Sequence, residues 1–198
     1  MNPSQFTPQQ SLDVITGIIQ EARIRQEENG RIYMYWGIVV ALVSFGDYFL
    51  RDSPISEYYF LPYFLIPLAA IGSFFFFKKK LHPSQKGNLA GNLLRTVWIF
   101  ASANMMLLGF VFPVELANHL IPFLMILLGM ALSISGIVLK YRPLSISGLT
   151  ANLVGLGCLW LPWQFQPLAM ALISISCVLV PGIMLWQAHR QRLHVQRP

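Results

Sequence analysis

Long apolar runs alternate with short polar segments along most of this chain, and there are six such runs. Each is close to the ~20 residues that a helix needs to cross the hydrocarbon core of a bilayer. The runs lack the two-residue alternation of a membrane β-strand, and unpaired backbone groups are too costly in lipid, so we expect helices. The expected spans are about Ile32–Leu50, Tyr58–Phe77, Leu93–Phe112, Leu120–Leu139, Pro143–Trp163 and Phe165–Trp186. The pattern predicts an all-α fold, a polytopic membrane helical bundle of six transmembrane helices.

The composition points to the same environment. Of the 198 residues, 55% are hydrophobic and 11% are charged, whereas a soluble domain carries about 25% charged residues. The formal net charge of +6 does not indicate a nucleic-acid partner, because the positive residues are scattered over short segments between apolar runs. A nucleic-acid-binding domain gathers them on one face. Lipid is therefore the expected partner.

The positive residues divide unequally between the two sides of the alternation, and this asymmetry predicts the orientation. Only Arg51 falls in the segments that also hold Asp52, Glu57 and Glu115. Short loops rich in Lys and Arg stay in the cytoplasm, so we predict a multi-pass protein of the bacterial inner membrane with both termini cytoplasmic. The thirteen residues on the cytoplasmic side are Arg23, Arg25, Arg31, Lys78, Lys79, Lys80, Lys86, Arg95, Lys140, Arg142, Arg190, Arg192 and Arg197.

The segment before the first span has the pattern of an amphipathic helix. Thr7 and Pro8 suit a helix start, and Gly30 suits its end. An apolar stripe at helical spacing lies between them, formed by Leu12, Ile15, Ile19 and Ala22. We expect this N-terminal cytoplasmic amphipathic helix either to lie on the membrane or the bundle, or to dock a second copy or a cytosolic partner. The domains are then residues 1–31, a cytoplasmic tail with this helix; 32–186, the transmembrane domain; and 187–198, a basic cytoplasmic tail.

Asp47 is the acidic residue that lies inside an expected span. Ionisable groups in a membrane are candidates for function. Arg51 follows four residues later, the favourable order for a helical ion pair. We expect a local ion pair near the outer interface, with a role in transport or proton relay as the alternative.

Other polar candidates are less informative. Asn104 and Asn152 lie within spans, where we expect hydrogen bonds between helices. Glu115 and His119 are four residues apart at the outer end, but a metal site needs more ligands. We therefore expect no metal and no cofactor. The sequence has no recognised nucleotide-binding, hydrolase or metalloprotease motif, and we name no catalytic residue.

The basic cluster after the second span sets the topology and can also contact anionic lipid headgroups. Its members are Lys78, Lys79, Lys80 and Lys86.

Small residues four positions apart are frequent in the spans, as at Gly129 and Ser133, and this spacing allows helices to approach closely. Proline also recurs near the starts of the second, fourth and sixth spans, at Pro67, Pro122 and Pro167. Three tandem hairpins would explain the recurrence, as would the ordinary preference of proline for early helical positions.

The chain resembles a family of small six-span inner-membrane proteins common in Bacteroidetes. The matching stretches cover nearly the whole chain in order: SLDVITGIIQEARIR leading after Gly30 into YWGIVVALVS, then IPLAAIGSFFFFKKK, ILLGMALSISGIVLKYRPL and LVPGIMLWQAHR. The resemblance implies the same topology and the same cytoplasmic helix, and it brings no catalytic residues.

Our leading hypothesis is a non-enzymatic interaction or regulatory membrane protein that uses its N-terminal helix to hold a cytosolic or membrane partner or another copy of itself. The second is a small transporter or channel for a neutral or apolar solute, since six short-looped helices suit that class. The third is a membrane-embedded enzyme that modifies lipid.

Overall fold

The computed structural model describes residue 17 and residues 30–51, 53–54, 56–78 and 89–195. Within these ranges the chain forms helices and no strands. The longer elements are α2 (Gly30–Arg51), α3 (Leu65–Lys78), α4 (Leu89–Met106), α6 (Leu120–Val138), α7 (Arg142–Gly157), α8 (Gln166–Ile173) and α9 (Val180–Val195). The shorter ones are the 3-10 turns η1 (Ser56–Tyr58), η2 (Leu61–Phe64), η5 (Ala117–His119) and η6 (Trp163–Phe165), the π-helical turns η4 (Leu107–Val111) and η7 (Ser174–Leu179), and α5 (Pro113–Leu116).

Four of the described helical stretches are long and apolar enough to cross a membrane. They coincide with the first, third, fourth and sixth expected spans, and they are Gly30–Arg51, Asn92–Val111, Leu120–Val138 and Trp163–Ala188. The all-helical prediction is therefore confirmed for the described residues, with several helices compatible with a membrane.

The boundaries of the other two expected spans need correction. The second run begins as the 3-10 turns η1 and η2, so that α3 has 14 residues. Pro67 consequently lies in the first turn of α3, where proline is tolerated. The fifth run ends earlier than expected, because α7 stops at Gly157 after 16 residues. Residues 187–195 of the expected basic tail are helical, since α9 continues to Val195.

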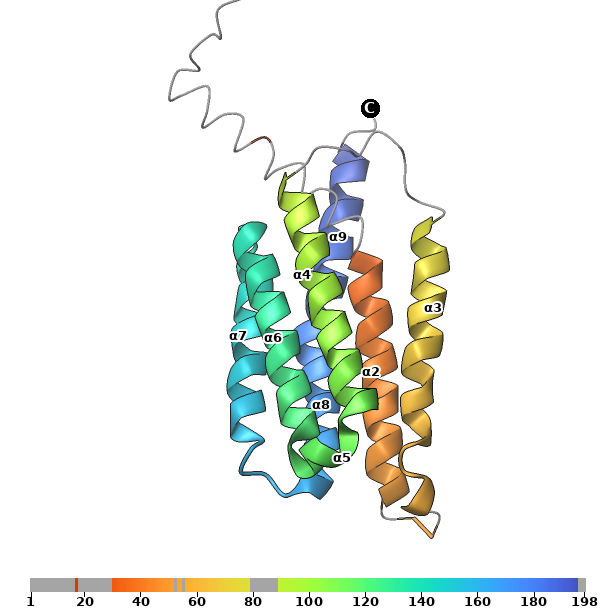
Figure 1. The fold of residues 1–198 in the computed structure, drawn as a ribbon. Helices are drawn as coiled ribbons and strands as arrows, with labels where there is room; N and C mark the ends of the chain where they lie inside the picture. Colours follow the sequence, from red (N-terminus) through yellow and green to blue (C-terminus); the bar gives the residue numbers. More distant parts are fainter. Residues whose placement is uncertain (1–16, 18–29, 52, 55, 79–88, 196–198) are drawn as a thin grey trace, which may run out of the picture.

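The helices stand side by side, with their ends gathered in two groups (Figure 1). The start of α2, the end of α3, the start of α4, the α6–α7 turn and the end of α9 lie at one end, which we call the basic end. The end of α2, η1, η2, α5 and η6 lie at the other, the Arg51 end. The sequence predicts that the segments rich in Lys and Arg lie in the cytoplasm. The described parts of those segments all lie at the basic end of the bundle (Figure 1).

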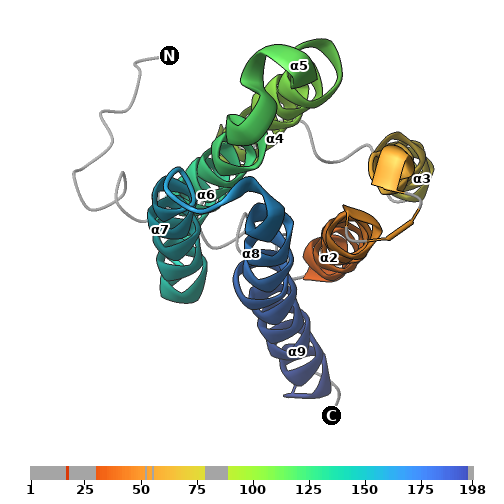
Figure 2. The ribbon, with the colours of Figure 1, turned by 90° about the horizontal axis from the view of Figure 1, so that it is seen from below.

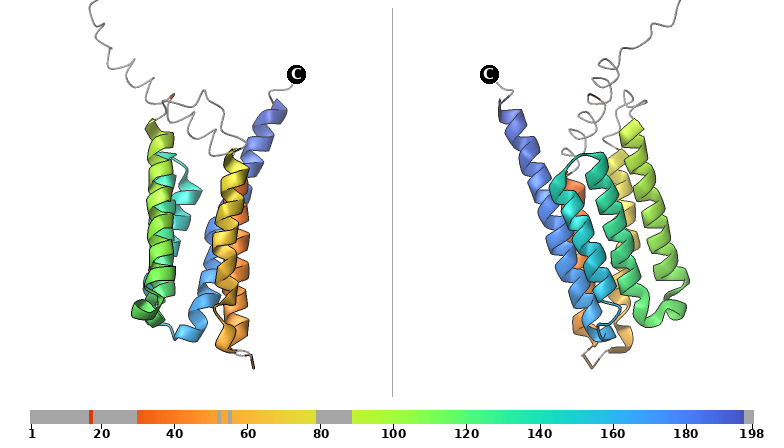
Figure 3. Two further views of the ribbon diagram at one scale, coloured as in Figure 1. Left: turned by 45° about the vertical axis from the view of Figure 1, so that its right-hand side comes forward. Right: turned by 90° about the vertical axis from the view of Figure 1, so that its left-hand side faces the viewer.

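Viewed along the helices, α2 and α8 occupy the middle of an open arrangement, and α9 runs from α8 toward its edge (Figure 2). The hairpin of α6 and α7 packs on one side of α8 and α9, and α3 packs on the outer side of α2. α4 packs against α6 on the side of α6 that faces away from α7 (Figure 2). α9 extends beyond the neighbouring helices at the basic end (Figure 3). The outer faces of α3 and α4 therefore have no helix packed against them among the described elements.

Close contact between α6 and α7 depends on residues without large side chains. A methyl group added at Gly148 would collide with the backbone nitrogen and Oγ of Ser133, and one added at Gly136 would collide with Ser145. At Gly129 it would lie 2.7 Å from the backbone nitrogen of Asn152. The sequence prediction of close packing at Gly129 and Ser133 is confirmed, and the two backbones pack directly against each other.

Buried polar side chains join helices that are distant in the sequence. Nε1 of Trp98 on α4 donates to Oγ of Ser135 on α6 (3.1 Å), and Tyr33 on α2 packs its ring edge-on against Trp98. Ser174, in the π-helical turn η7, donates from Oγ to the carbonyl of Gly37 on α2 (2.9 Å). Such bonds fix the relative rotation of the helices, because a buried hydroxyl left without a partner is costly.

Gly148→Ala should lower the free energy of unfolding by about 1–3 kcal/mol, since the new methyl group forces α6 and α7 apart. Gly157→Ala, on the same helix but facing open space, is the matched control and should lower it by less than about 0.5 kcal/mol. Unfolding of the purified protein in mixed micelles, followed by circular dichroism, measures both. Equal losses in the two variants would contradict the close-packing interpretation.

The α6–α7 turn holds a residue in an unusual backbone conformation. Lys140 has a φ of 50°, which costs a residue other than glycine about 1–2 kcal/mol. The N–H of Tyr141 donates to the carbonyl of Gly136 (2.9 Å) and that of Lys140 to Ile137 (3.1 Å). This is the bonding of a Schellman C-cap, in which glycine is the usual residue at the left-handed position.

Lys140→Gly should raise the free energy of unfolding by about 0.5–1 kcal/mol, because the side chain that disfavours this φ is removed. Lys140→Ala removes the same charge but keeps Cβ, so it should bring no gain. The two variants are compared in the same unfolding assay, and a larger gain from alanine would show that charge, not backbone strain, matters at this turn.

Candidate functional site: a buried ion pair held by aromatic rings

The last two turns of α2 carry the most deeply buried charge in the described part of the chain. Asp47 is 0% exposed. Arg51 lies one helical turn later on the same face, donating from Nε to Oδ1 of Asp47 (2.7 Å) and from Nη2 to Oδ2 (2.8 Å). The expected ion pair is therefore present, with both arginine nitrogens engaged in the parallel geometry that makes such pairs strong.

Residues from two other segments complete the site. The hydroxyl of Tyr63 in η2 donates to Oδ2 of Asp47 (2.8 Å). Nη1 of Arg51 donates to the carbonyl of Trp163 in η6 (3.3 Å). The guanidinium carbon lies 4.4 Å from the ring centroid of Trp163 and 5.1 Å from that of Tyr59, within cation–π range. We call these five residues the Asp47 cluster.

The cluster joins three parts of the chain at the Arg51 end. Each oxygen of Asp47 accepts at least one hydrogen bond, and Nε, Nη1 and Nη2 of Arg51 each donate one. A carboxylate whose charge is fully matched in this way is poorly suited to bind a coupled ion or pass a proton along a relay. Its arrangement is that of a structural clasp, which holds the end of α2 to the segment before α3 and to the segment before α8.

The two asparagines do not act as expected. Nδ2 of Asn104 donates to the carbonyl of Phe100 (2.8 Å), and Nδ2 of Asn152 donates to that of Gly148 (3.0 Å). Both bonds go back one turn in the same helix, so the prediction of hydrogen bonds between helices of the chain is wrong for both. The reason at Asn152 is the close contact with Gly129, which places backbone, not a polar side chain, opposite it.

The remaining candidates do not converge on the cluster. Glu115 in α5 and His119 in η5 are exposed at the Arg51 end, and the described residues contain no group of three His, Cys, Asp or Glu side chains that could hold a metal ion. Lys78 is the last residue of α3. The docking stripe of Leu12, Ile15, Ile19 and Ala22 and the residues Lys79, Lys80 and Lys86 lie outside the described residues.

Sequence reasoning missed the partners of the charged pair. Tyr59, Tyr63 and Trp163 were not among its candidate functional residues. In the sequence these three residues share one property: each is an aromatic residue with a polar group, in a short segment on the same side of the membrane pattern as Arg51. Gln166 was missed as well: it is buried, and its Nε2 donates to the carbonyls of Leu161 (3.1 Å) and Cys158 (3.3 Å), closing the turn before α8.

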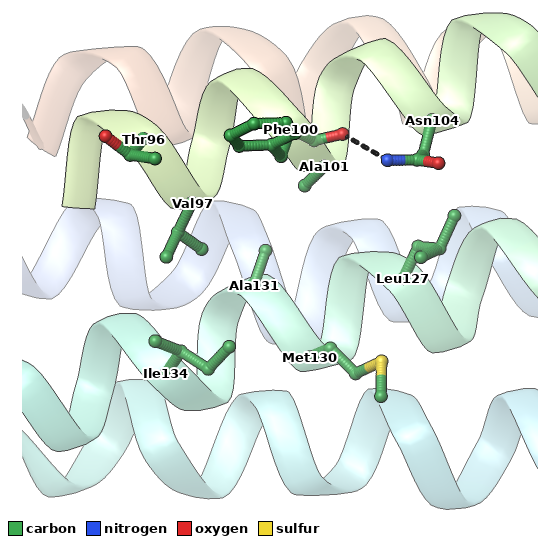
Figure 4. A pocket seen from close by; sticks show the side chains of 9 residues that line it. All are labelled: Thr96, Val97, Phe100, Ala101, Asn104, Leu127, Met130, Ala131 and Ile134. Carbon is green, nitrogen blue, oxygen red and sulfur yellow. Dashed lines mark hydrogen bonds between the residues drawn. The ribbon is translucent and has the colours of Figure 1, made fainter. Parts of the chain in front are cut away.

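A groove of about 310 Å³ lies between α4 and α6, away from the Asp47 cluster (Figure 4). Its lining is Thr96, Val97, Phe100, Ala101, Asn104, Leu127, Met130, Ala131 and Ile134. Ala101 and Ala131 point toward each other across its floor, and Thr96 and Asn104 supply its polar side chains. The groove is open and mostly apolar, unlike a polar path through the middle of a bundle.

No family model, curated protein sequence or solved structure matches the chain. The site is therefore interpreted from its own geometry and chemistry.

Arg51→Met should lower the free energy of unfolding by about 3–5 kcal/mol, because it leaves the Asp47 carboxylate buried without its counter-charge. The double variant Asp47→Leu with Arg51→Met should recover most of that loss, since it removes the buried charge as well. Unfolding in mixed micelles compares both with the unmodified protein. A double variant no more stable than Arg51→Met alone would contradict the clasp interpretation.

Proposed function

We propose that this chain is an integral protein of the bacterial inner membrane that crosses the bilayer six times, with both termini in the cytoplasm, and acts by binding other proteins rather than by catalysis. The observation that carries the proposal is the one-sided placement of positive charge. Among the described residues Arg31, Lys78, Lys140, Arg142 and Arg190 belong to the basic end, and Arg51 to the opposite end. Cytoplasmic loops carry such an excess.

Helix lengths support six spans. With a rise of ~1.5 Å per residue, the 14 residues of α3 cover ~21 Å, and the four residues of η2 add ~8 Å in a 3-10 turn. Together they approach the ~30 Å of a hydrocarbon core. α7 covers ~24 Å by the same rise, and the turn up to Pro162 extends the run further. These two elements lie alongside the four longer spans, so a shared membrane is the simplest account (Figure 1).

An interaction role fits the described interior better than transport does. The deeply buried charge, Asp47, is matched by Arg51 and Tyr63. The middle of the bundle is filled by residues such as Met125, Leu132 and Val178, and α6 and α7 meet at glycine and serine. A transporter for a neutral or apolar solute therefore finds less support here. We assign partner binding to residues 7–29, as their amphipathic pattern suggests, and place the chain with the six-span family that it resembles.

Reporter fusions test the topology. An enzyme active only in the cytoplasm should be active when fused after Pro198 or inserted at residue 84, and inactive when inserted at residue 54 or residue 118. A reporter active only outside the cytoplasm should give the reverse pattern. A C-terminus outside the cytoplasm would overturn the six-span proposal.

Deletion of residues 1–29 tests the proposed docking helix. The remaining bundle should keep its thermal stability in detergent, while proteins crosslinked to the full chain in cells should be recovered at least about tenfold less, the effect of losing ~1.4 kcal/mol of binding. Leu12→Glu with Ile19→Glu is the matched variant that keeps the segment but breaks its apolar stripe. Unchanged crosslinked partners in both would rule out docking through this helix.

A further inference from the structure

Of the four candidate spans, the one that contains α4 is the least buried. In the most apolar 18 residues of the candidate span Asn92–Val111, 6% of the residues are buried, whereas the buried share in the other three candidate spans is 33% to 50%. Phe100 is 65% exposed and Leu93 is 47% exposed. The outer face of α4 borders the α4–α6 groove and points away from α2 and α8–α9 (Figure 4).

The exposed face of α4 has the spacing of a helix that packs against a copy of itself. Leu93, Val97, Phe100 and Asn104 follow one another at intervals of four, three and four residues. We call them the α4 stripe. This is the 3.5-residue period of a coiled-coil seam, in which Val97 and Asn104 take the a positions and Leu93 and Phe100 the d positions. A single Asn at an a position fixes register and oligomeric state in such seams.

Asn104 is the feature that separates a protein partner from lipid. It is exposed, and it lies near the middle of its candidate span. One amide N–H is used by the carbonyl of Phe100, while its Oδ1 has no hydrogen-bond partner among the described residues. Acyl chains offer no hydrogen bonds, so a polar amide at this depth is stabilised by a polar group on another helix.

We infer that this face binds a second copy of the chain, with the two α4 helices crossing at Asn104. The inference rests on the proposed membrane insertion. Copies inserted with the same orientation are related by a two-fold axis along the bilayer normal, so their α4 helices run parallel and equal depths meet. The Asn104 amide carries both a donor and an acceptor, and it can therefore pair with the same side chain of the second copy.

The α4–α6 groove can accommodate part of the second α4 helix. Ala101 and Ala131 form its floor, and small side chains allow a helix to approach closely in lipid. Met130 and Ile134 of α6 flank the position that the second α4 would occupy. The dimer thus uses a surface of α4 and α6, separate from the Asp47 cluster at the Arg51 end and from residues 7–29.

Energy transfer between labelled copies of the full chain tests the inference. Donor- and acceptor-labelled protein is reconstituted in vesicles of phosphatidylcholine and phosphatidylglycerol at decreasing protein-to-lipid ratios. Asn104→Leu should need an about tenfold higher ratio for half-maximal transfer, because the interhelical hydrogen bonds are lost. Thr150→Val is the matched control: Thr150 is also exposed and bonds back one turn, to Ile146, but lies on α7. It should behave like the unmodified chain.

Oxidative crosslinking locates the contact independently. In a chain with Cys158→Ala and Cys177→Ala, the variant Phe100→Cys should form dimers rapidly. Ile99→Cys, which is 56% exposed but off the α4 stripe, should form them at least about tenfold more slowly, since its side chain points away from the seam. Equal rates, or no difference between Asn104→Leu and Thr150→Val, would overturn the assignment, as would the absence of energy transfer in the unmodified chain.

Carbonate extraction of the membranes separates this inference from the proposal on which it rests. Release of the protein by carbonate would overturn membrane insertion and the dimer together. Retention in the membrane without energy transfer would overturn the dimer alone.

Discussion

Direct contact between helix backbones is the interaction on which the described bundle depends. In lipid, apolar side chains gain little by leaving their surroundings, so helices associate through close packing and hydrogen bonds. Gly148 and Gly136 leave no room for a methyl group between α6 and α7. The same holds where Gly30 and Gly182 bring α2 against α9. These contacts set the positions of the central helices, and the rest of the chain packs around them.

At the Arg51 end, the Asp47 cluster stabilises a buried charge. Burying a carboxylate is costly unless its charge and lone pairs are matched. Arg51 and Tyr63 provide that match, and the guanidinium is in turn held between Tyr59 and Trp163. Leaving the Asp47 carboxylate without these partners would be costly. The end of α2 is therefore held in the arrangement in which Arg51 and Tyr63 both reach it.

The helices of the bundle are unevenly covered by one another. α2 lies between α3 and α8, and α8 lies between α2 and the α6–α7 hairpin, whereas α3 and α4 each contact the bundle along one side. On α3 the exposed side chains Leu68 and Ile71 are apolar, and lipid would suffice to cover them in the proposed membrane. For α4 the outer face carries Asn104, which lipid cannot satisfy. This amide is the reason why we infer a protein contact on α4 and none on α3.

The sequence by itself determined the helical class, the position of four apolar helices and the pairing of Asp47 with Arg51. Each follows from local rules: length of an apolar run, helical period and a four-residue spacing of opposite charges. It misplaced the start of α3 and the end of α7, because 3-10 turns and the break before Pro162 are not visible in hydropathy alone. It also assigned Asn104 and Asn152 to bonds between helices of the chain, whereas each bonds back one turn in its own helix. Tertiary structure alone decided that Tyr63 and Trp163 meet Arg51, that Ser174 reaches Gly37, and that the α4 stripe faces outward. Those facts depend on which helix faces come together, and that is set by packing among residues far apart in the chain.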